Sequence, residues 1–260
     1  MMLREMNRRT LLSLVALVIL VILSAATLDY SGLSTFSPSM GMDVLRGLGQ
    51  PDWQFLYDGS GEDLISLLLL TIGIACLGTM IATVLAIPIT LISAVNLWQA
   101  HPWVTKNGKL ICNVLRAFPE LVFAIIFVKV VGSGPFAGVM AIGVHQIGML
   151  GKLFTEEMEA MDERLVEEMH AVGANFWQTI FFVRIPYLMP IYCSLALNHF
   201  EIAVRSAATL GLVGAGGIGA PLIFAIQTRS WSKVSIILIG VVVTVFILDQ
   251  ITGIIRKKLR

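Results

Sequence analysis

The chain has 260 residues, of which 57% are hydrophobic and 13% are charged, and its mean hydropathy is +0.85. Soluble domains carry about 25% charged residues, so this composition excludes an ordinary soluble domain and predicts an all-α protein that crosses a membrane several times. The net charge of +1 gives no indication of nucleic-acid binding. Its three cysteines lie in apolar runs without the spacing of a zinc or redox site, which favours small buried hydrophobic residues.

The N-terminal stretch combines a basic start with a long apolar run. Arg4, Arg8 and Arg9 precede "TLLSLVALVILVILSAATL", which is long enough to span a bilayer. The small residues near its end would also suit the cleavage region of a signal peptide. An uncleaved first helix over 10–28 with a positive-inside anchor is favoured, followed by a polar segment over 29–61 on the outer side.

Five further helices are expected after this segment, so about six spans in total. The second begins near Asp63 and stays helical to about Trp98, longer than a hydrocarbon core of about 30 Å requires. It must therefore tilt, project from the bilayer or kink at Pro88. The later helices are predicted over 111–131 with an early interruption at Pro119, from after "GSGPFAG" to about 154, over 186–210 and over 233–253.

Six spans place both termini on the same side of the membrane. Of the 18 lysines and arginines, thirteen fall on that side and five do not, so the positive-inside rule predicts that both termini are cytoplasmic. The sequence shows no internal repeat of the kind that single-chain secondary transporters carry. The thirteen residues are Arg4, Arg8, Arg9, Lys106, Lys109, Arg116, Lys152, Arg164, Arg184, Arg256, Lys257, Lys258 and Arg260, and the five are Arg46, Lys129, Arg205, Arg229 and Lys233.

A charged block over 156–184 interrupts the apolar chain on the predicted cytoplasmic side. Within it, Gly173 can end one short helix and Asn175 can cap the next, so residues 163–180 are expected to form two short helices with an elbow. The pattern also suits an amphipathic linker on lipid headgroups. Its acidic character favours a protein partner, because an anionic membrane surface repels it. The expected apolar stripe comprises Leu165, Met169, Val172, Phe176 and Ile180.

The spacing within this block resembles the cytoplasmic loop motif of ATP-binding-cassette importer permeases. The family pattern is E-A-A, three residues, G, nine residues, I, any residue and L-P, and Glu167, Gly173 and Pro186 match it. The positions that differ are Glu168 and Met169, which replace two alanines, and Val183 and Ile185, which are conservative replacements.

This resemblance implies that the helix pair docks on a separate cytoplasmic ATPase. The sequence has no G-x-x-x-x-G-K-[ST] loop, so ATP and Mg²⁺ are expected in the partner and no cofactor is expected in this chain. Met169 and Phe176 would be apolar anchors, with acidic residues at the rim. The residues assigned to docking are Leu165, Glu167, Glu168, Met169, Ala171, Val172, Gly173, Ala174, Asn175, Phe176 and Pro186.

A second resemblance, over about 62–255, narrows the family. The stretches "GPFAGV", "FEIAVRSA" and "GLVGAGGIG" resemble the permease subunit of phosphonate importers, whose relatives include phosphite importers. The resemblance implies a type I importer permease in the bacterial inner membrane, working as two copies with two ATPases and an extracytoplasmic binding protein. The expected organisation is an N-terminal helix and outer segment over 1–61, a permease core over 62–255 and a basic tail over 256–260.

Two features inside the predicted membrane region point to a translocation path. Glu201 and Arg205 share one helix face, and charges within a span usually face a bundle interior or a watery cavity. They are interpreted either as a mutually neutralising pair or, for Arg205, as an aid to anion passage. The glycine-rich stretch 211–219 suits either a gate or a plain turn with a tight helix contact, and a gate is favoured. The residues assigned to the path are Glu201, Arg205, Ser206, Gly214, Gly216 and Gly217.

The leading hypothesis is therefore an importer permease for phosphonate, phosphite or a related oxyanion, without catalytic or metal residues of its own. The same fold could carry an amino acid or another small solute. A channel or secondary carrier would need neither the elbow motif nor an ATPase. An intramembrane enzyme would need a Ser/His, Asp/Asp or His/Glu set at membrane depth, and the sequence offers no such set.

Overall fold

The computed structural model describes residues 8–29, 38–59 and 61–259. Arg4, Arg260 and part of the predicted outer segment, 30–37, lie outside the described residues. Contacts divide the chain into two units, residues 1–45 and 46–260. In the first unit, α1 (Arg8–Thr27) is an exposed helix that is long and apolar enough to cross a membrane, as the sequence predicts.

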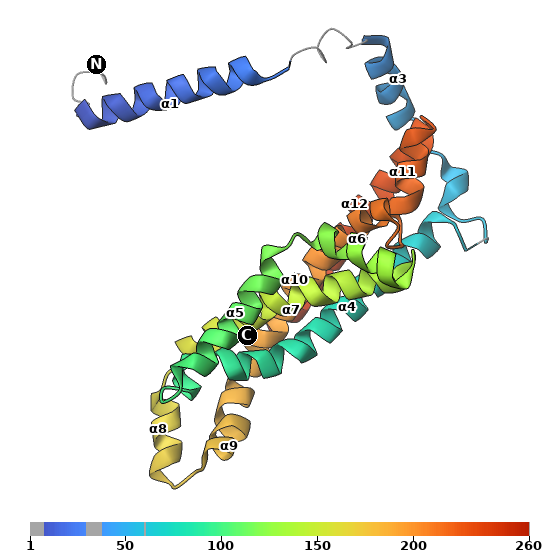
Figure 1. Ribbon diagram of the computed structural model, residues 1–260. Helices are drawn as coiled ribbons and strands as arrows, with labels where there is room; N and C mark the ends of the chain where they lie inside the picture. The colour runs from blue at the N-terminus through green and yellow to red at the C-terminus, as the bar shows by residue number, and fades with distance from the viewer. Residues whose placement is uncertain (1–7, 30–37, 60, 260) are drawn as a thin grey trace. The chain divides into compact units, whose positions relative to one another are not determined.

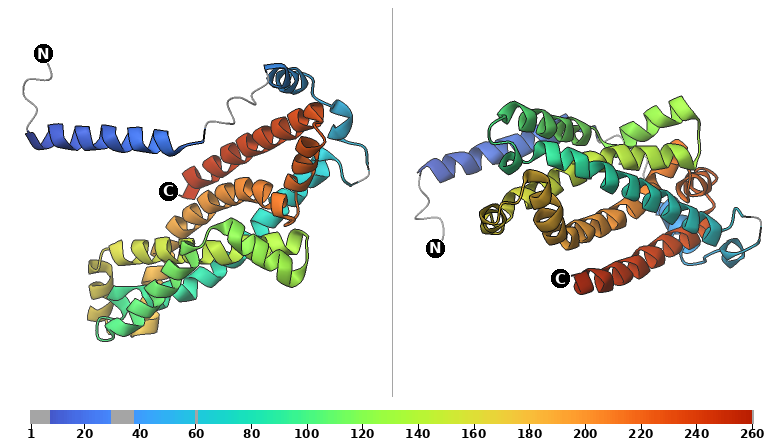
Figure 2. Two further views of the ribbon diagram at one scale, coloured as in Figure 1. Left: turned by 45° about the horizontal axis from the view of Figure 1, so that its top comes forward. Right: turned by 90° about the horizontal axis from the view of Figure 1, so that it is seen from below.

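The second unit is a bundle of helices (Figure 1; Figure 2). Short segments join the longer helices: α3 (Pro38–Leu48) begins in the first unit, and η1 (Trp53–Leu56) follows it. The remaining elements are α4 (Leu64–Ser93), η2 (Val95–Leu97), α5 (Pro102–Ala117), α6 (Glu120–Val131), α7 (Pro135–Ala160), α8 (Arg164–Ala171), α9 (Phe176–Thr179), η3 (Ile180–Arg184), α10 (Ile185–Leu210), η4 (Gly211–Val213), α11 (Gly219–Gln227) and α12 (Trp231–Leu259).

Local sequence signals account for the ends of several helices. The Asp63 side chain accepts a hydrogen bond from the Ser66 N–H at 2.8 Å and caps the start of α4. The predicted third span is divided into α5 and α6, because Phe118 and Pro119 adopt extended backbone between them. Helix α4 continues through Pro88 to Ser93, and at about 1.5 Å per residue it is longer than a hydrocarbon core.

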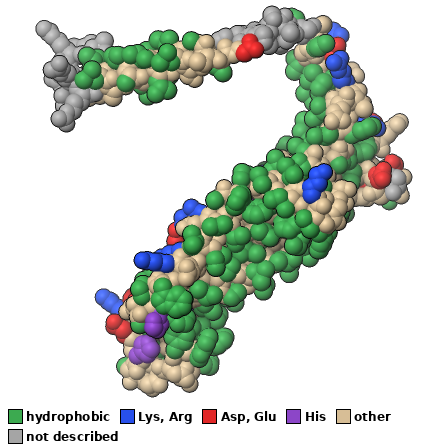
Figure 3. Space-filling view, viewed as in Figure 1, with side chains coloured by type: hydrophobic (Ala, Val, Ile, Leu, Met, Phe, Trp, Pro, Cys, Tyr) green, Lys and Arg blue, Asp and Glu red, His purple; other side chains and the backbone are tan. Residues whose placement is uncertain are grey.

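Among the described residues, five helices are long and apolar enough to cross a membrane by length and composition. The third of the six predicted spans is not among them, because the break at Pro119 leaves α6 with 12 residues. Hydrophobic side chains cover most of the bundle face in Figure 3, while charged side chains gather toward both ends and the visible histidine side chains lie at the end that carries α8 and α9. This distribution is that of a protein whose middle lies in hydrocarbon and whose charged ends lie in water.

Helices α4, α7 and α10 form the centre of the bundle, and small residues let them approach closely. One buried cluster joins Ile74, Ile142 and Leu210 in the middle, and a second lies nearer α8 and α9. A third, around Leu64 and Ile236, holds η1 against α12. Since lipid tails are as apolar as leucine, close packing rather than burial from water stabilises such contacts.

Segment 46–58 of the predicted outer region belongs with this bundle. The Ser235 Oγ of α12 donates a hydrogen bond to the Leu48 carbonyl at 2.7 Å, and the Asp52 N–H donates to the Ser232 carbonyl at 3.1 Å. Lys233 lies over the Phe55 ring at 5.8 Å from its centroid. These contacts fix the segment against the start of α12.

We expect Gly78→Ala to destabilise the bundle. A Cβ at Gly78 would lie 2.8 Å from Cγ2 of Ile142, which is fully buried on α7, and relieving such overpacking costs about 1–3 kcal/mol. Gly73→Ala is the matched control in the same helix, since its Cβ would meet nothing within 4 Å. Thermal melting of the detergent-purified protein at a fixed scan rate should show a lower apparent Tm for Gly78→Ala alone. Equal melting of the two variants would contradict this packing.

Candidate functional site

Two short helices, α8 and α9, project from one end of the second unit and are joined by a tight turn (Figure 1). We call residues 164–179 the hairpin. Gly173 forms the turn with a φ of +84°, a conformation that other residues adopt with strain, and its N–H donates to the His170 carbonyl at 3.0 Å. The elbow therefore lies where the sequence predicts it.

The second helix of the hairpin starts with a complete capping box. The Asn175 side chain accepts from the Gln178 N–H at 2.9 Å, and the Gln178 side chain accepts from the Asn175 N–H at 2.8 Å. After Thr179 the chain passes through the π-helix η3 into α10 without leaving a helical path. Widened turns of this kind are frequent at functional sites.

The predicted apolar stripe is wrong in part. Val172 is 77% exposed, whereas Val166, outside the stripe, is 7% exposed and packs inward. The reason is that α8 ends at Ala171, so Val172 lies in the turn and not on the helix face that the predicted stripe assumed. Of the other docking candidates, Leu165 and Met169 are half-buried, Ala174 is half-buried, and the exposed ones are Glu167, Glu168, Ala171, Gly173, Asn175, Phe176 and Pro186.

Aromatic side chains surround the second half of the hairpin. Phe176 packs against Trp98, with ring centroids 6.3 Å apart, and against Trp177 at 5.4 Å. Trp177 is 60% exposed and stacks on Phe181. The predicted anchor Phe176 is thus partly used inside the chain, and Trp177, which the sequence interpretation did not include, is the more exposed apolar group beside it.

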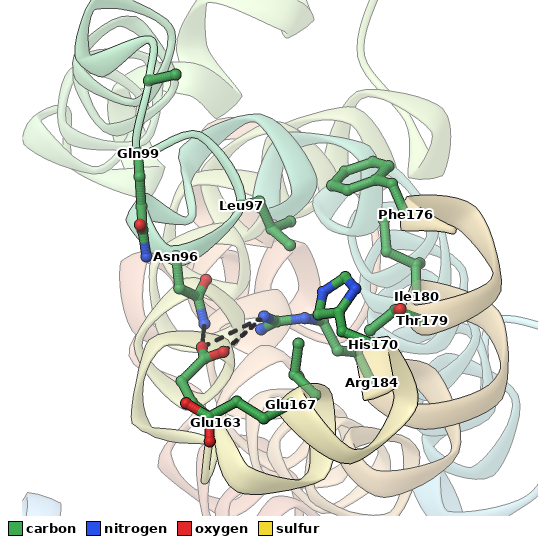
Figure 4. A pocket seen from close by; sticks show the side chains of 12 residues that line it. Asn96, Leu97, Gln99, Glu163, Glu167, His170, Phe176, Thr179, Ile180 and Arg184 are labelled. Carbon is green, nitrogen blue, oxygen red and sulfur yellow. Dashed lines mark hydrogen bonds and ion pairs between the residues drawn. The ribbon is translucent and has the colours of Figure 1, made fainter. Parts of the chain in front are cut away.

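A cavity of about 380 Å³ lies between the hairpin and the segment after α4 (Figure 4). Arg184 and Glu163 meet there with an N–O distance of 3.2 Å, and Asn96 donates to the same carboxylate at 2.8 Å. Beneath the hairpin, Tyr192 stacks on Phe154 and donates to its carbonyl at 3.0 Å. The lining residues are Asn96, Leu97, Gln99, Ala100, Glu163, Val166, Glu167, His170, Phe176, Thr179, Ile180 and Arg184.

The sequence interpretation did not identify the Arg184, Glu163 and Asn96 network. Arg184 is the charged residue of the apolar stretch "FFVRIP", and its side chain is only 3% exposed. A single cation in such a stretch is a signal that a partner exists, because a buried charge is costly when unpaired. The partner lies 21 residues earlier, and no short-range pattern identifies it.

Glu201 does not pair with Arg205, and this part of the sequence interpretation is wrong. Glu201 is buried between α10 and α12, where Arg256 contacts it at 2.6 Å and the Thr252 hydroxyl donates to the same carboxylate. Arg256 belongs to the last turns of α12, which runs to Leu259 through most of the predicted tail. The pair joins two helices that run in opposite directions, which the i, i+4 spacing within α10 could not reveal.

Arg205 lies on the exposed side of α10, and Ser206 beside it is half-buried. With Asp249 it lines a depression of about 510 Å³ whose other residues are Val241, Val242, Val245 and Phe246. Within the described part of the chain, Arg205 has no ion-pair partner. A guanidinium in apolar surroundings needs water, an anion or another chain.

The glycine-rich segment is a turn that packs tightly against other helices. The Gly134 N–H donates to the Gly214 carbonyl at 2.9 Å, and a Cβ at Gly216 would lie 2.8 Å from the Pro135 nitrogen. The Ile218 N–H donates to Thr71 of α4 at 3.0 Å, and a Cβ at Gly217 would meet the same hydroxyl at 2.7 Å. Gly214, Gly216 and Gly217, the three glycines assigned to the path, all have positive φ. The contacts of this segment link α4, the turn before α7 and the end of α10.

Among the described residues, no group of three or more His, Cys, Asp and Glu could hold a metal ion. The buried polar groups instead connect helices. The Gln146 side chain of α7, for example, donates to the His199 carbonyl of α10 at 3.0 Å.

The sequence matches a model of the binding-protein-dependent transport system inner membrane component over residues 86–260. The phosphite transport system permease protein PtxC of Stutzerimonas stutzeri is 35% identical over 190 residues, which cover 73% of this chain and 69% of that protein. The phosphate-import permease protein PhnE of Mycolicibacterium smegmatis is 33% identical over 210 residues, 78% of this chain and 38% of that protein.

Solved structures show the same fold. The methionine ABC transporter MetNI in inward-facing conformations gives a TM-score of 0.63 with 18% sequence identity, over 86% of this chain and 100% of that chain. An amino acid ABC transporter gives a TM-score of 0.62 with 18% identity, over 75% of this chain and 93% of that chain. The all-helical bundle is therefore that of an importer permease.

The chain belongs to the family of binding-protein-dependent transport system inner membrane components and is a multi-pass inner-membrane protein. The cryptic phosphonate transport system permease protein PhnE2 of Escherichia coli is 38% identical over 118 residues, 45% of this chain and 97% of that protein. The resemblance to permeases of phosphonate and phosphite importers is confirmed by these relatives, which are transport permeases.

We expect Asn175→Ala to loosen the start of α9. The substitution removes the acceptor of the Gln178 N–H and half of the capping box, which costs about 1 kcal/mol, or roughly fivefold in the population of the open helix end. Hydrogen–deuterium exchange of the peptide covering 174–180 should accelerate by a similar factor. Asn113→Ala, at an exposed position of α5, is the control and should leave that peptide unchanged. Unaltered exchange in Asn175→Ala would contradict the capping role.

Proposed function

We propose that this chain is the transmembrane subunit of an ATP-driven importer that moves phosphonate, phosphite or a related oxyanion into the cell by alternating access. The observation that carries the proposal is the exposed hairpin at one end of an apolar bundle, in a chain similar to phosphite and phosphonate permeases. The hairpin is the docking element for a separate ATPase, and its movement changes the packing of the spans behind it.

The hairpin end is the cytoplasmic end in this proposal, and both termini lie on that side. The reason is the distribution of basic residues, because lysines and arginines prefer the cytoplasmic ends of spans. Lys109 and Lys152 lie beside the hairpin end, and the last turn of α12 carries Arg256, Lys257 and Lys258.

The proposed complex contains two copies of the permease, two ATPases and an extracytoplasmic binding protein that selects the cargo. ATP and Mg²⁺ are bound by the ATPases, and this chain binds no cofactor. Since two putative phosphite transport permeases, HtxC and HtxE, occur in Stutzerimonas stutzeri, a second permease of different sequence is the alternative to a second copy. Pull-down of the assembled complex distinguishes the two arrangements.

Arg205, Ser206 and the glycine-rich segment form part of the translocation path in this proposal. Support comes from the exposed, unpaired guanidinium of Arg205 within the described chain, since a weakly held cation attracts an oxyanion without trapping it. Gly214, Gly216 and Gly217 would act as the gate, because the segment they form links three parts of the bundle. Glu201 would contribute only by holding α10 against α12.

We expect Gly173→Pro to abolish coupling while leaving the chain inserted. Proline fixes φ near −65°, whereas the turn has a φ of +84°, and it also removes the N–H that bonds to His170. In proteoliposomes with the ATPase and binding protein, uptake of phosphite and its stimulation of ATP hydrolysis should fall about tenfold or more.

Gly173→Asn is the matched control, because asparagine tolerates a positive φ, and it should keep most of the uptake. Normal uptake together with normal stimulated hydrolysis in Gly173→Pro would contradict the proposed coupling. The absence of any ATP-hydrolysing subunit from the purified wild-type complex would contradict the proposed class of transporter.

We expect Arg205→Ala to lower uptake about tenfold, while the yield of assembled complex stays within about twofold of wild type. The reason is that Arg205 is exposed and makes no ion pair in the described chain, so its removal leaves no buried charge unpaired. Lys129→Ala removes an exposed cation from the end of α6 and serves as the control. If the yield of complex falls in step with uptake, Arg205 is structural instead.

A further inference from the structure

The base of the hairpin is closed by an ion pair between Arg184, which is buried, and Glu163, whose side chain is 46% exposed. Arg184 is the last residue of η3, directly before α10, and its side chain is 3% exposed. Its Nη2 lies 3.2 Å from Glu163 Oε2 and 3.3 Å from Oε1. Glu163 directly precedes α8, so the pair joins the residue before the hairpin to the end of η3, the segment that follows the hairpin (Figure 4).

The same carboxylate reaches a third segment. Asn96, in the short η2 turn after α4, donates through Nδ2 to Glu163 Oε1 at 2.8 Å and to the Met158 carbonyl at 2.8 Å. Glu159, near the end of α7, accepts a hydrogen bond from the Val95 N–H at 2.8 Å and forms an ion pair with Lys109 of α5 at 2.9 Å. The base of the hairpin is therefore connected to the end of α4, the middle of α5 and the start of α10.

We propose that Arg184 is a positioning residue for energy coupling: its ion pair with Glu163 holds the two ends of the hairpin together, so that α8 and α9 move α10 and the α4–α5 connection as one body. This inference rests on the proposed ATPase partner and adds to it the residues that transmit the movement.

Few residues are buried within the hairpin, which explains why its base has to be held together. Val166 is the buried residue of α8, and Thr179 is the buried residue of α9, while the turn between them is exposed. A pair of helices with so little shared core does not resist opening by its own packing. A load on the tip would separate α8 from α9 unless the base is fixed, and the movement would then stop before α10.

The network of Arg184, Glu163 and Asn96 also contains polar atoms that its hydrogen bonds do not use. Arg184 Nη1 and Asn96 Oδ1 are buried without a hydrogen-bond partner among the described residues. The orientation of the Asn96 amide is set by its contacts, because both partners of Nδ2 are acceptors. An unpaired guanidinium nitrogen and an unpaired amide oxygen at one junction leave it able to make further hydrogen bonds in the assembled complex.

An ion pair with one buried and one exposed member is weak evidence for stability, since desolvation of the buried charge and solvent screening of the exposed charge offset much of the attraction. A role in coupling and a role in folding therefore predict different measurements. The test uses the full complex in proteoliposomes, with the permease, its ATPase and its binding protein, and phosphite as the transported anion. Uptake and ATP hydrolysis are measured on the same vesicles, and their ratio is compared between variants.

We expect Arg184→Gln to assemble and hydrolyse ATP within about twofold of wild type. Uptake per ATP hydrolysed should fall about tenfold, because the contact between Arg184 and Glu163 no longer holds the two ends of the hairpin together. Arg184→Lys, which keeps the charge, should recover part of the ratio. The charge exchange R184E/E163R should restore it to within about threefold of wild type. The matched control is the exchange K152E/E156K within α7, where the pair lies 3.3 Å apart and exposed, and the ratio should not change.

The proposal is overturned if Arg184→Gln keeps the wild-type ratio. It is also overturned if both Arg184→Gln and the charge exchange lose most of the assembled complex while the complex that remains couples normally. The ion pair would then serve folding alone. Wild-type vesicles that take up no phosphite in response to ATP would instead refute the proposed function, and this outcome is distinguishable because it appears before any residue is changed.

Discussion

An apolar bundle can hold a charged side chain only where another group neutralises it or where water reaches it, and this constraint accounts for much of the arrangement described above. Arg184 and Glu201 are both buried, and each has its partner on a different segment. Arg184 thereby fixes the hairpin to α10, and Glu201 fixes α10 to α12. These contacts connect α10 to its neighbours at two levels along its length.

Arg205 shows the opposite case on the same helix. It is exposed and has no ion-pair partner within the described chain, and the surrounding side chains of α12 are apolar except for Asp249. A lipid-facing position would leave the guanidinium without solvation. The exposed face of α10 therefore requires water or a protein partner, as it would have if a second permease completed a hydrated path there. Helix α10 thus connects the hairpin at one end to the candidate path at the other.

The sequence predicts those features that depend on neighbouring residues. The capping box at Asn175, the turn at Gly173 and the helix start at Asp63 each follow from groups within a few positions of one another. The ion pairs of Arg184 and Glu201 join residues 21 and 55 positions apart, and only tertiary packing brings them together. The i, i+4 spacing of Glu201 and Arg205 favoured the wrong partner, because a helix face says nothing about which neighbouring helix supplies a stronger contact.

The same distinction between local and tertiary contacts decides how the hairpin can work. Its shape is set locally, by a glycine turn and a capping box, so it can keep its form while most of its side chains remain free to bind a partner. Its attachment is set by tertiary contacts, through Arg184, Glu163 and Asn96. If the hairpin docks on an ATPase as proposed, the surface that engages the partner cannot also be buried within its own chain, so the rigidity that carries the movement has to come from the base of the hairpin.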